Sequence, residues 1–265
     1  MDDIDNRVKV ATYSILAAGV VIMKFDPVTV GSTVKSTIGD FVTDADVESE
    51  KIIQQIIQIS YPKDVILSEE TTDSHYLLNP ENLSTLTGWV IDPIDGTNNY
   101  KKGMSYYAIS VAYIEKGKPL LGVVYDPYRR ELYVAVAGRG VTRNDQPISV
   151  SEKAVFDSAA RVCTSNSYEG GTQANLERYS KLGHVWVDVL GSAVLIMTDI
   201  ASGRLDLYHH NGLKPWDNAA TFLIAQEAGA KITDLSGKPT NWLTKEVVIG
   251  NPKLVDEFIA RTAKA

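Results

Sequence analysis

The sequence predicts an α+β protein whose two halves are built differently. In the first half, three strand-like segments follow one another with only short turns between them, at residues 106–114, 120–125 and 131–137. Consecutive strands joined by short turns form antiparallel sheets. Beyond about residue 148, strand-like and helix-like segments alternate, which is typical of an α/β arrangement. We therefore predict a mainly antiparallel N-terminal half, residues 1–148, abutting a smaller α/β C-terminal half, residues 149–265, with a cleft between them.

Two amphipathic helices are predicted ahead of the antiparallel strands. Apolar residues recur at helical spacing within residues 5–23, and a second such pattern runs from Asp46 towards Pro62. Thr43, Asp44 and Asp46 all suit the N-cap of the second helix. A short buried strand follows at residues 65–67. We expect the two helices to cover one face of the sheet.

The C-terminal half contains shorter elements that alternate. Strands are predicted at residues 160–164, 184–190, 205–209, 231–234 and 246–250, and helices at 191–201, 214–227 and 252–263. Gly229 suits the C-terminal end of the second of these helices, because glycine adopts the left-handed conformation that ends many helices.

Composition excludes several classes of protein. The chain has 265 residues and is 44% hydrophobic, enough to bury a substantial core. Its net charge of −7 argues against binding nucleic acid polymers or anionic membranes, which requires a basic face. An anionic substrate stays open, since bound divalent cations reverse the local sign. The single cysteine, Cys163, the acidic N-terminus and the short apolar runs predict a cytoplasmic protein without a membrane span.

One strand-like run ends in two aspartates. The apolar residues 89–91 lead to Asp92 and Asp95, which flank a proline, and then to Gly96 and Thr97. Two carboxylates, a stiff turn and a glycine at a strand end indicate a site for a divalent metal and a phosphate. The same residue types are common in solvated turns, which is the structural alternative. The adjacent Glu69–Glu70 pair at the end of strand 65–67 has the same two interpretations.

Taken together, the polar segments resemble the inositol monophosphatase family of magnesium-dependent, lithium-sensitive phosphatases. The segments that match are Val-Thr-Asp-Ala-Asp at 42–46, Ser-Glu-Glu-Thr at 68–71, Asp-Pro-Ile-Asp-Gly-Thr-Asn at 92–98, Gly-Ser-Ala at 191–193 and Trp-Asp-Asn-Ala-Ala at 216–220. The resemblance extends from about Lys35 to Asn251. It implies a layered α/β/α/β/α sandwich of the sugar phosphatase type.

The resemblance also assigns roles to individual residues. Glu69, Asp92 and the carbonyl of Ile94 would hold one Mg²⁺, and Asp92, Asp95 and Asp217 a second, with a third, weaker ion near Glu69 and Glu70. The implied catalytic residues are Glu69, Thr97 and Asp46. Thr97 and Asp46 would orient the attacking water. The implied contacts to the substrate come from Lys35, Asp95, Gly96, Thr97, Gly191, Ser192, Ala193, His210 and Asp217. Mg²⁺ prefers hard oxygen ligands, and two ions would offset the four clustered carboxylates.

Three positions depart from the family pattern. Ser68 stands where glycine is common, and Thr221 replaces another frequent glycine. The third is His210, at the position where inositol-specific members carry an acidic residue that contacts inositol hydroxyls. An imidazole changes a pure acceptor into a donor and acceptor, and a cationic imidazole would favour a second anionic group on the substrate. A transition-metal site at His209–His210 is disfavoured, because adjacent strand residues point to opposite faces.

The resemblance implies a Mg²⁺-dependent phosphomonoesterase that hydrolyses a small polyol or sugar phosphate by metal-activated water, with inositol monophosphate as the leading substrate. Fructose 1,6-bisphosphate, a 3′(2′),5′-bisphosphate nucleotide and histidinol phosphate are the alternative substrates. A catalytically silent regulatory or binding oligomer is the alternative outside enzymology. By the same resemblance, the chain is expected to form a homodimer. The departure at His210 leaves the physiological substrate open.

Overall fold

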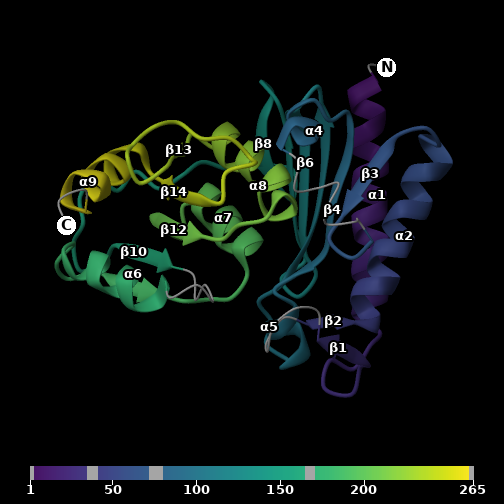
Figure 1. Ribbon diagram of the computed structural model, residues 1–265, viewed down its shortest axis with the longest axis horizontal. Helices are drawn as coiled ribbons and strands as arrows, with labels where there is room; N and C mark the ends of the chain where they lie inside the picture. Colours follow the sequence, from purple (N-terminus) through teal and green to yellow (C-terminus); the bar gives the residue numbers. More distant parts are fainter. Residues whose placement is uncertain (1–2, 35–40, 72–79, 165–170, 263–265) are drawn as a thin grey trace.

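The computed structural model describes residues 3–34, 41–71, 80–164 and 171–262. Within these ranges the chain forms five layers: helices, a sheet, helices, a second sheet and outer helices (Figure 1). This order confirms the predicted α/β/α/β/α sandwich. The division of the chain at residue 148 stays a prediction.

The larger sheet has seven strands and comes entirely from the first part of the chain. In spatial order they are β3 (Val65–Ser68), β4 (Gly88–Asp95), β5 (Ala108–Glu115), β6 (Lys118–Asp126), β7 (Glu131–Val136), β8 (Gly140–Arg143) and β9 (Gln146–Pro147). All neighbours pair antiparallel except β3 and β4, which are parallel. The prediction of a mainly antiparallel sheet is therefore confirmed.

Strand β4 extends further than its apolar run predicts, through both aspartates to Asp95. Asp92 pairs with Ser110 on β5, whereas Asp95 pairs with Ala108, so β4 carries one extra residue in between. Such a β-bulge resets the alternation of side chains along a strand. Residues three apart on a regular strand point to opposite faces. The bulge therefore allows the side chains of Asp92 and Asp95 to point to the same face of the sheet.

Two long helices, α1 (Asp3–Ile22) and α2 (Asp44–Ser60), cover one face of this sheet, on the right of Figure 1. Their buried residues form one apolar cluster with alternate residues of the central strands, including Ile15, Ile53, Trp89, Val111 and Val123. This confirms the predicted placement of the helices. A small hairpin of β1 (Ser32–Val34) and β2 (Phe41–Thr43) precedes α2, and two short helices, α4 (Pro80–Ser84) and α5 (Thr97–Lys101), flank β4 in the chain.

The middle layer consists of α7 (Ala193–Ala201) and α8 (Pro215–Glu227). Every residue of α7 from Val194 to Ala201 is buried, because sheets lie on both sides of this layer. Residues of both helices share a large apolar cluster with the face of the first sheet opposite to α1 and α2. The start of each helix thus lies beside the end of β4, where the polar motif is found.

The second sheet has five strands, in the spatial order β11 (Trp186–Asp188), β10 (Arg161–Thr164), β12 (Leu207–Asn211), β14 (Glu246–Gly250) and β13 (Lys231–Thr233). The outer helices α6 (Gly171–Ser180) and α9 (Pro252–Thr262) cover its far face. Helix α6 was not predicted, because few apolar residues mark it. Among the described residues, none of the helices combines the length and apolarity that crossing a membrane requires.

Candidate active site

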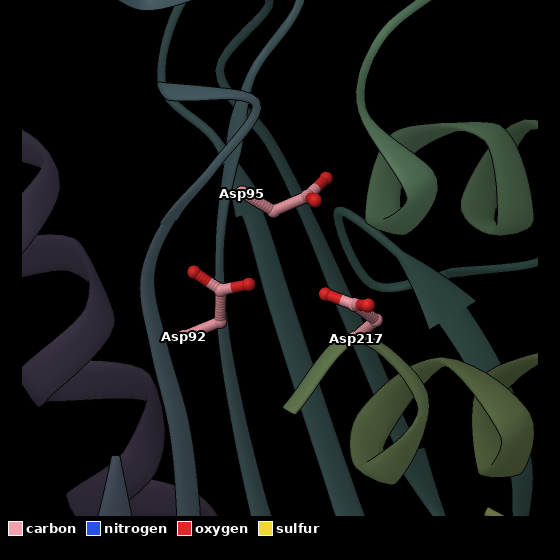
Figure 2. A group of neighbouring side chains, drawn as sticks. All are labelled: Asp92, Asp95 and Asp217. Carbon is pink, nitrogen blue, oxygen red and sulfur yellow. The ribbon is translucent and has the colours of Figure 1, made fainter. Parts of the chain in front are cut away.

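Three aspartates from separate elements meet where the first sheet adjoins the middle helices. Asp92 and Asp95 lie on β4, and Asp217 lies in the first turn of α8. Figure 2 shows the carboxylate of Asp217 facing the two β4 side chains from the start of its helix. One carboxylate oxygen of each residue lies within 4.8 Å of the other two. We call these residues the acidic trio.

Electrostatics make the acidic trio costly without a counter-charge. Two like charges 4.8 Å apart repel by roughly 3–4 kcal/mol at an effective dielectric constant near 20. Burial, with a smaller contribution from the Glu69 charge, raises the pKa of Asp95 to about 6 against the hydrogen bonds from Ser192 and Val194, which lower it. The pKa of Asp217 lies well above its usual value because of burial and the charges of Asp95 and Glu69. Clustered buried carboxylates fit a hard divalent cation such as Mg²⁺.

Asp95 is held by the N-terminus of α7, across the two halves of the chain. The Ser192 hydroxyl and the backbone N–H of Val194 (2.9 Å) both donate to Asp95 Oδ2. Ser192 is the N-cap of α7, and its Oγ accepts a hydrogen bond from the N–H of Leu195. A carboxylate is favoured at this positive end of the helix dipole. Of the expected substrate contacts, Ser192 thus already binds a predicted metal ligand.

Asp217 is held by its own helix. Its Oδ2 accepts a hydrogen bond of 2.6 Å from the backbone N–H of Lys214, the N-cap residue of α8. The hydroxyl of Thr221 donates to the Asp217 carbonyl at 2.5 Å. Thr221 is fully buried, so this departure from the usual glycine supports the first turn of the helix that carries Asp217.

Thr97 connects β4 to the start of α2. Its Oγ1 lies 3.1 Å from Asp46 Oδ1 and 2.8 Å from the Ile94 carbonyl oxygen, and its one hydrogen is donated to either acceptor. Asp46 also forms a capping box with Thr43, whose backbone N–H donates to Asp46 Oδ2 at 2.9 Å. Capping of α2 by this segment is therefore confirmed. Asp46 also contacts Thr97, the residue with which the family pattern pairs it.

Glu69 follows β3 and stays outside the acidic trio. Its backbone N–H donates to the Ile91 carbonyl at 3.3 Å, which fixes the residue beside β4. Its charge lies close enough to raise the pKa of both Asp95 and Asp217. The ligand role of Glu69, and of Glu70 for a third ion, stays a prediction. Lys35 lies outside the described residues.

Two glycines allow the segments that lead into α5 and α7 to approach. Gly96 and Gly191 have positive φ angles of 87° and 79°, a conformation that favours glycine. A Cβ atom on Gly96 would lie 3.1 Å from Ser192 Cβ. Asn99 holds the contact, because its amide Nδ2 donates to the carbonyls of Tyr106 and Leu190 at 2.7 Å each. Sequence reasoning missed Asn99, although its place directly after the Gly-Thr-Asn motif is a signal.

His210 lies on the side of β12 that faces the middle helices. Its Nδ1 is hydrogen-bonded to the hydroxyl of Tyr208, which shares this face. Burial raises the pKa of Tyr208 well above its usual value, and Cys163, Asp95 and Asp217 add to the rise, which places this tyrosine near the acidic trio. Sequence reasoning missed Tyr208.

Burial, and secondarily the neighbouring His209, lowers the pKa of His210 to about 3, so its ring is neutral near pH 7. The cationic His210 considered from the sequence is therefore wrong. His209 points the other way, towards Phe258 of α9, with its Nε2 3.4 Å from Glu246. The prediction that the two rings lie on opposite faces is confirmed. The neutral ring carries one hydrogen: it resides on Nε2 when the Tyr208 hydroxyl donates to Nδ1, and on Nδ1 when the hydroxyl accepts.

Comparison with known proteins identifies the class. A sequence profile of the Inositol monophosphatase family matches residues 3–265. The chain is 36% identical to a protein named Nus factor SuhB of Pasteurella multocida over 233 residues, covering 86% of this chain and 84% of the relative. It is 34% identical to an inositol-1-monophosphatase of Synechocystis sp. over 260 residues, covering 97% and 88%.

Solved structures agree with the sequence relatives. An IMPase from Thermotoga maritima superimposes with a TM-score of 0.85 at 32% identity, covering 100% of this chain and 98% of that one. An IMPase/NADP phosphatase crystallised with Mg²⁺ and phosphate gives a TM-score of 0.77 at 25% identity, covering 92% and 88%. The fold and the acidic trio thus define a metal-dependent phosphatase. The chain belongs to the inositol monophosphatase family.

Proposed function

We propose that this chain is a Mg²⁺-dependent phosphomonoesterase that acts on a small polyol or sugar phosphate, with inositol monophosphate as the leading substrate. The observation that carries the proposal is the acidic trio at the junction of β4 with the middle helices, formed by the buried Asp92 and Asp95 and the half-buried Asp217. Such a cluster is stabilised by divalent cations and is suited to an anionic ester.

By the family pattern, Glu69, Asp92 and the Ile94 carbonyl would hold one ion, and Asp92, Asp95 and Asp217 a second. Bound Mg²⁺ polarises the phosphoryl group and lowers the pKa of water. The closeness of three of these side chains supports the assignment.

Thr97 and Asp46 are proposed to orient the attacking water. With its hydrogen donated to Asp46 or Ile94, Thr97 Oγ1 keeps lone pairs that accept a hydrogen bond from a water molecule. Asp46 is buried and fixed by Thr43, so the pair is preorganised rather than assembled on binding.

The phosphate and the rest of the substrate would lie between α5 and α7. The backbone at Gly96 and Thr97 and the segment from Gly191 to Ala193 border the acidic trio, and the N-terminus of α7 favours an anionic group. Lys35 is proposed to attract the phosphate at the mouth of the site.

The proposed preference among the candidate substrates rests on His210. Tyr208 occupies its Nδ1, so only Nε2 is left for a ligand. We propose the tautomer in which Tyr208 donates to Nδ1, so that the ring offers an Nε2–H donor where an acidic residue would offer acceptors alone. A donor suits a hydroxyl oxygen and suits a second phosphate better, because charge-assisted hydrogen bonds are stronger. This favours a sugar bisphosphate as the second candidate. Bisphosphate nucleotides and histidinol phosphate belong in the same test.

The test is phosphate release from inositol 1-phosphate, fructose 1,6-bisphosphate, 3′-phosphoadenosine 5′-phosphate and histidinol phosphate, each with Mg²⁺ and with a chelator. We expect Mg²⁺-dependent release, with inositol 1-phosphate among the better substrates. Fast turnover of a bisphosphate beside little activity on inositol 1-phosphate would replace the leading substrate.

A role outside catalysis is the alternative, because several relatives are named Nus factor. The close packing of the acidic trio favours the enzyme. Absence of phosphate release from every ester, in protein that binds Mg²⁺ in a calorimeter, would favour the binding role. A homodimer is proposed from the family resemblance, and light scattering after gel filtration measures it.

A further inference from the structure

The first two turns of α2 carry a row of polar side chains that face the sheet. Asp46, Ser49 and Glu50 are all buried, on a helix face whose next buried residues are Ile53 and Ile57. Each of the three polar side chains hydrogen-bonds a different segment of the site. Asp46 reaches Thr97, whereas Ser49 and Glu50 have no role in the chemistry proposed above.

Ser49 contacts the segment that joins two members of the acidic trio. Its Oγ donates to the carbonyl of Pro93 at 2.9 Å. Pro93 lies within the β-bulge between Asp92 and Asp95, where the ladder to β5 is interrupted. A backbone carbonyl in such a bulge needs a partner from outside the ladder. Ser49 supplies that partner from α2.

Glu50 contacts both residues that flank Glu69. Its Oε2 accepts hydrogen bonds from the Ser68 hydroxyl at 2.5 Å and from the Glu70 backbone N–H at 3.2 Å. Its Oε1 accepts from Gln54 Nε2 at 2.8 Å, and the same nitrogen lies 3.1 Å from Thr71 Oγ1. The segment around Glu69 is thus tied to α2 on each side.

A purely structural contact would not require a carboxylate here. Glu50 is only 2% exposed. Among the described lysines and arginines, none forms an ion pair with its carboxylate. Burying a carboxylate costs several kcal/mol unless hydrogen bonds offset the lost hydration. Ile53 and Ile57 satisfy the packing of the same helix face with apolar groups.

We propose that Glu50 and Ser49 are positioning residues for the metal site: α2 holds the segments on either side of Glu69 and the bulge between Asp92 and Asp95 in the geometry that binds the cation. The inference rests on the proposed metal-dependent function. The segment around Glu69 is then fixed by three hydrogen bonds, from the backbone N–H of Glu69 to Ile91 and from the Ser68 hydroxyl and the Glu70 N–H to Glu50.

The departure at Ser68 acquires a role in this arrangement. Where glycine occupies this position, the hydroxyl that donates to Glu50 is missing, and only the Glu70 N–H remains on that oxygen. Ser68 is itself fully buried, so its hydroxyl has no access to bulk water. The additional hydrogen bond tightens the segment that carries Glu69.

The experiment measures Mg²⁺ binding by calorimetry in Glu50→Gln, with kcat and thermal unfolding recorded on the same preparations. A glutamine keeps the shape of the side chain, but its amide N–H₂ replaces one of the two oxygens that accept hydrogen bonds in the wild type. The matched control is Glu48→Gln, which removes the same charge from a half-buried position on the same helix, where the carboxylate pairs only with the exposed side chain of Lys51 among the described residues. Ser49→Ala and Ser68→Gly each remove one hydroxyl donor and leave the carboxylate.

We expect the Mg²⁺ dissociation constant to rise about tenfold in Glu50→Gln and about threefold in Ser49→Ala and Ser68→Gly, as for other residues that orient metal ligands. At saturating Mg²⁺, kcat should return to within about threefold of the wild-type value, because the bound cation reorders the segment. Glu48→Gln should bind Mg²⁺ like the wild type.

Dissociation constants within about twofold of the wild type in all three site variants would overturn the proposal. So would an equal loss in Glu48→Gln, because that loss would reflect net charge alone. Should Glu50→Gln not fold, Ser49→Ala and Ser68→Gly decide the matter. If the wild type hydrolyses no phosphate ester, the proposed function fails, while the calorimetric comparison still decides whether α2 positions the cation site.

Discussion

The two sides of the site are held together by different kinds of contact. On the side of β4, hydrogen bonds come from distant parts of the chain: Thr97 to Asp46, Pro93 to Ser49, and Asp95 to Ser192. On the side of β12 and α8, they come from neighbours in sequence. Asp217 bonds to the N-cap three residues before it, and His210 to Tyr208, two residues before it.

The contrast is clearest between β4 and β12: β4 carries two of the three proposed metal ligands of the acidic trio, whereas β12 carries His210, which we propose selects the substrate. Asp217 belongs to the acidic trio although its hydrogen bonds are local. A change on the β4 side disturbs contacts with several elements. We therefore expect it to lower both the free energy of unfolding and the affinity for Mg²⁺. A change at His210 disturbs one strand and its immediate partner. A change at His210 should therefore leave the acidic trio in place. The predictions below test this contrast.

The largest effect is expected for Asp92→Asn. The variant removes charge from the member of the trio that, by the family pattern, contacts both ions. We expect turnover at saturating Mg²⁺ to fall at least about 100-fold, roughly 2.7 kcal/mol of transition-state stabilisation. Initial rates of phosphate release measure it, with the exposed Asp145→Asn as the control. Near-normal turnover in Asp92→Asn would contradict the site.

Asn99→Ala should break the contact that joins the segment after β4 to the segment leading into α7. The substitution leaves the carbonyls of Tyr106 and Leu190 without their donor. Lost partners of buried groups cost about 1–3 kcal/mol each, so we expect the free energy of unfolding to fall by about 2–4 kcal/mol, with a roughly tenfold loss of kcat/KM. Urea unfolding and initial rates measure these effects. Asn98→Ala, at the exposed neighbouring position, should change the free energy of unfolding by no more than about 0.5 kcal/mol and kcat/KM by less than about twofold.

Mg²⁺ should stabilise the protein more at about pH 7.5 than at about pH 5. Burial raises the folded-state pKa of Asp95 to about 6 from 3.8 and raises that of Asp217, so the charged carboxyls destabilise the metal-free fold above pH 6. That cost disappears as the pH falls from about 6 to 4, because the folded state then binds more protons than the unfolded state.

Added cation binds the charged form and competes with those protons. Thermal unfolding with and without Mg²⁺ measures the difference between the two pH values. The half-saturating Mg²⁺ concentration should rise by up to about tenfold per pH unit below the pKa of Asp95. A shift in melting temperature that is the same at both pH values would show that these carboxyls do not bind the cation.

The smallest effect is expected for His210→Glu. The substitution restores an acceptor, so we expect the ratio of kcat/KM for inositol 1-phosphate to that for fructose 1,6-bisphosphate to rise about three- to tenfold, worth roughly 1 kcal/mol. The Mg²⁺ dissociation constant should change by less than about twofold if the two sides are independent. A large loss of Mg²⁺ affinity in this variant would show that His210 and the acidic trio are not independent.

Much of the fold was predictable because burial leaves a periodic pattern. The helices α1 and α2 and the strands β5 to β7 follow from apolar spacing and short turns. Helix α6 and strand β9 did not, since α6 has few apolar residues and β9 has only two residues. The end of β4 was placed too early, because Asp and Pro usually mark turns and here they form a bulge.

The sequence by itself determined which side chains carry oxygen ligands: the motif around Asp92 and Asp95, the Glu69–Glu70 pair and the Trp-Asp segment at Asp217. Local chemistry suffices for that, because residue type and spacing are written in the chain. Only the tertiary structure decided that the β4 bulge directs both aspartates to one face and that a buried glutamate on α2 holds the segment around Glu69. Both depend on hydrogen bonds between segments far apart in sequence, which packing creates and no local pattern records.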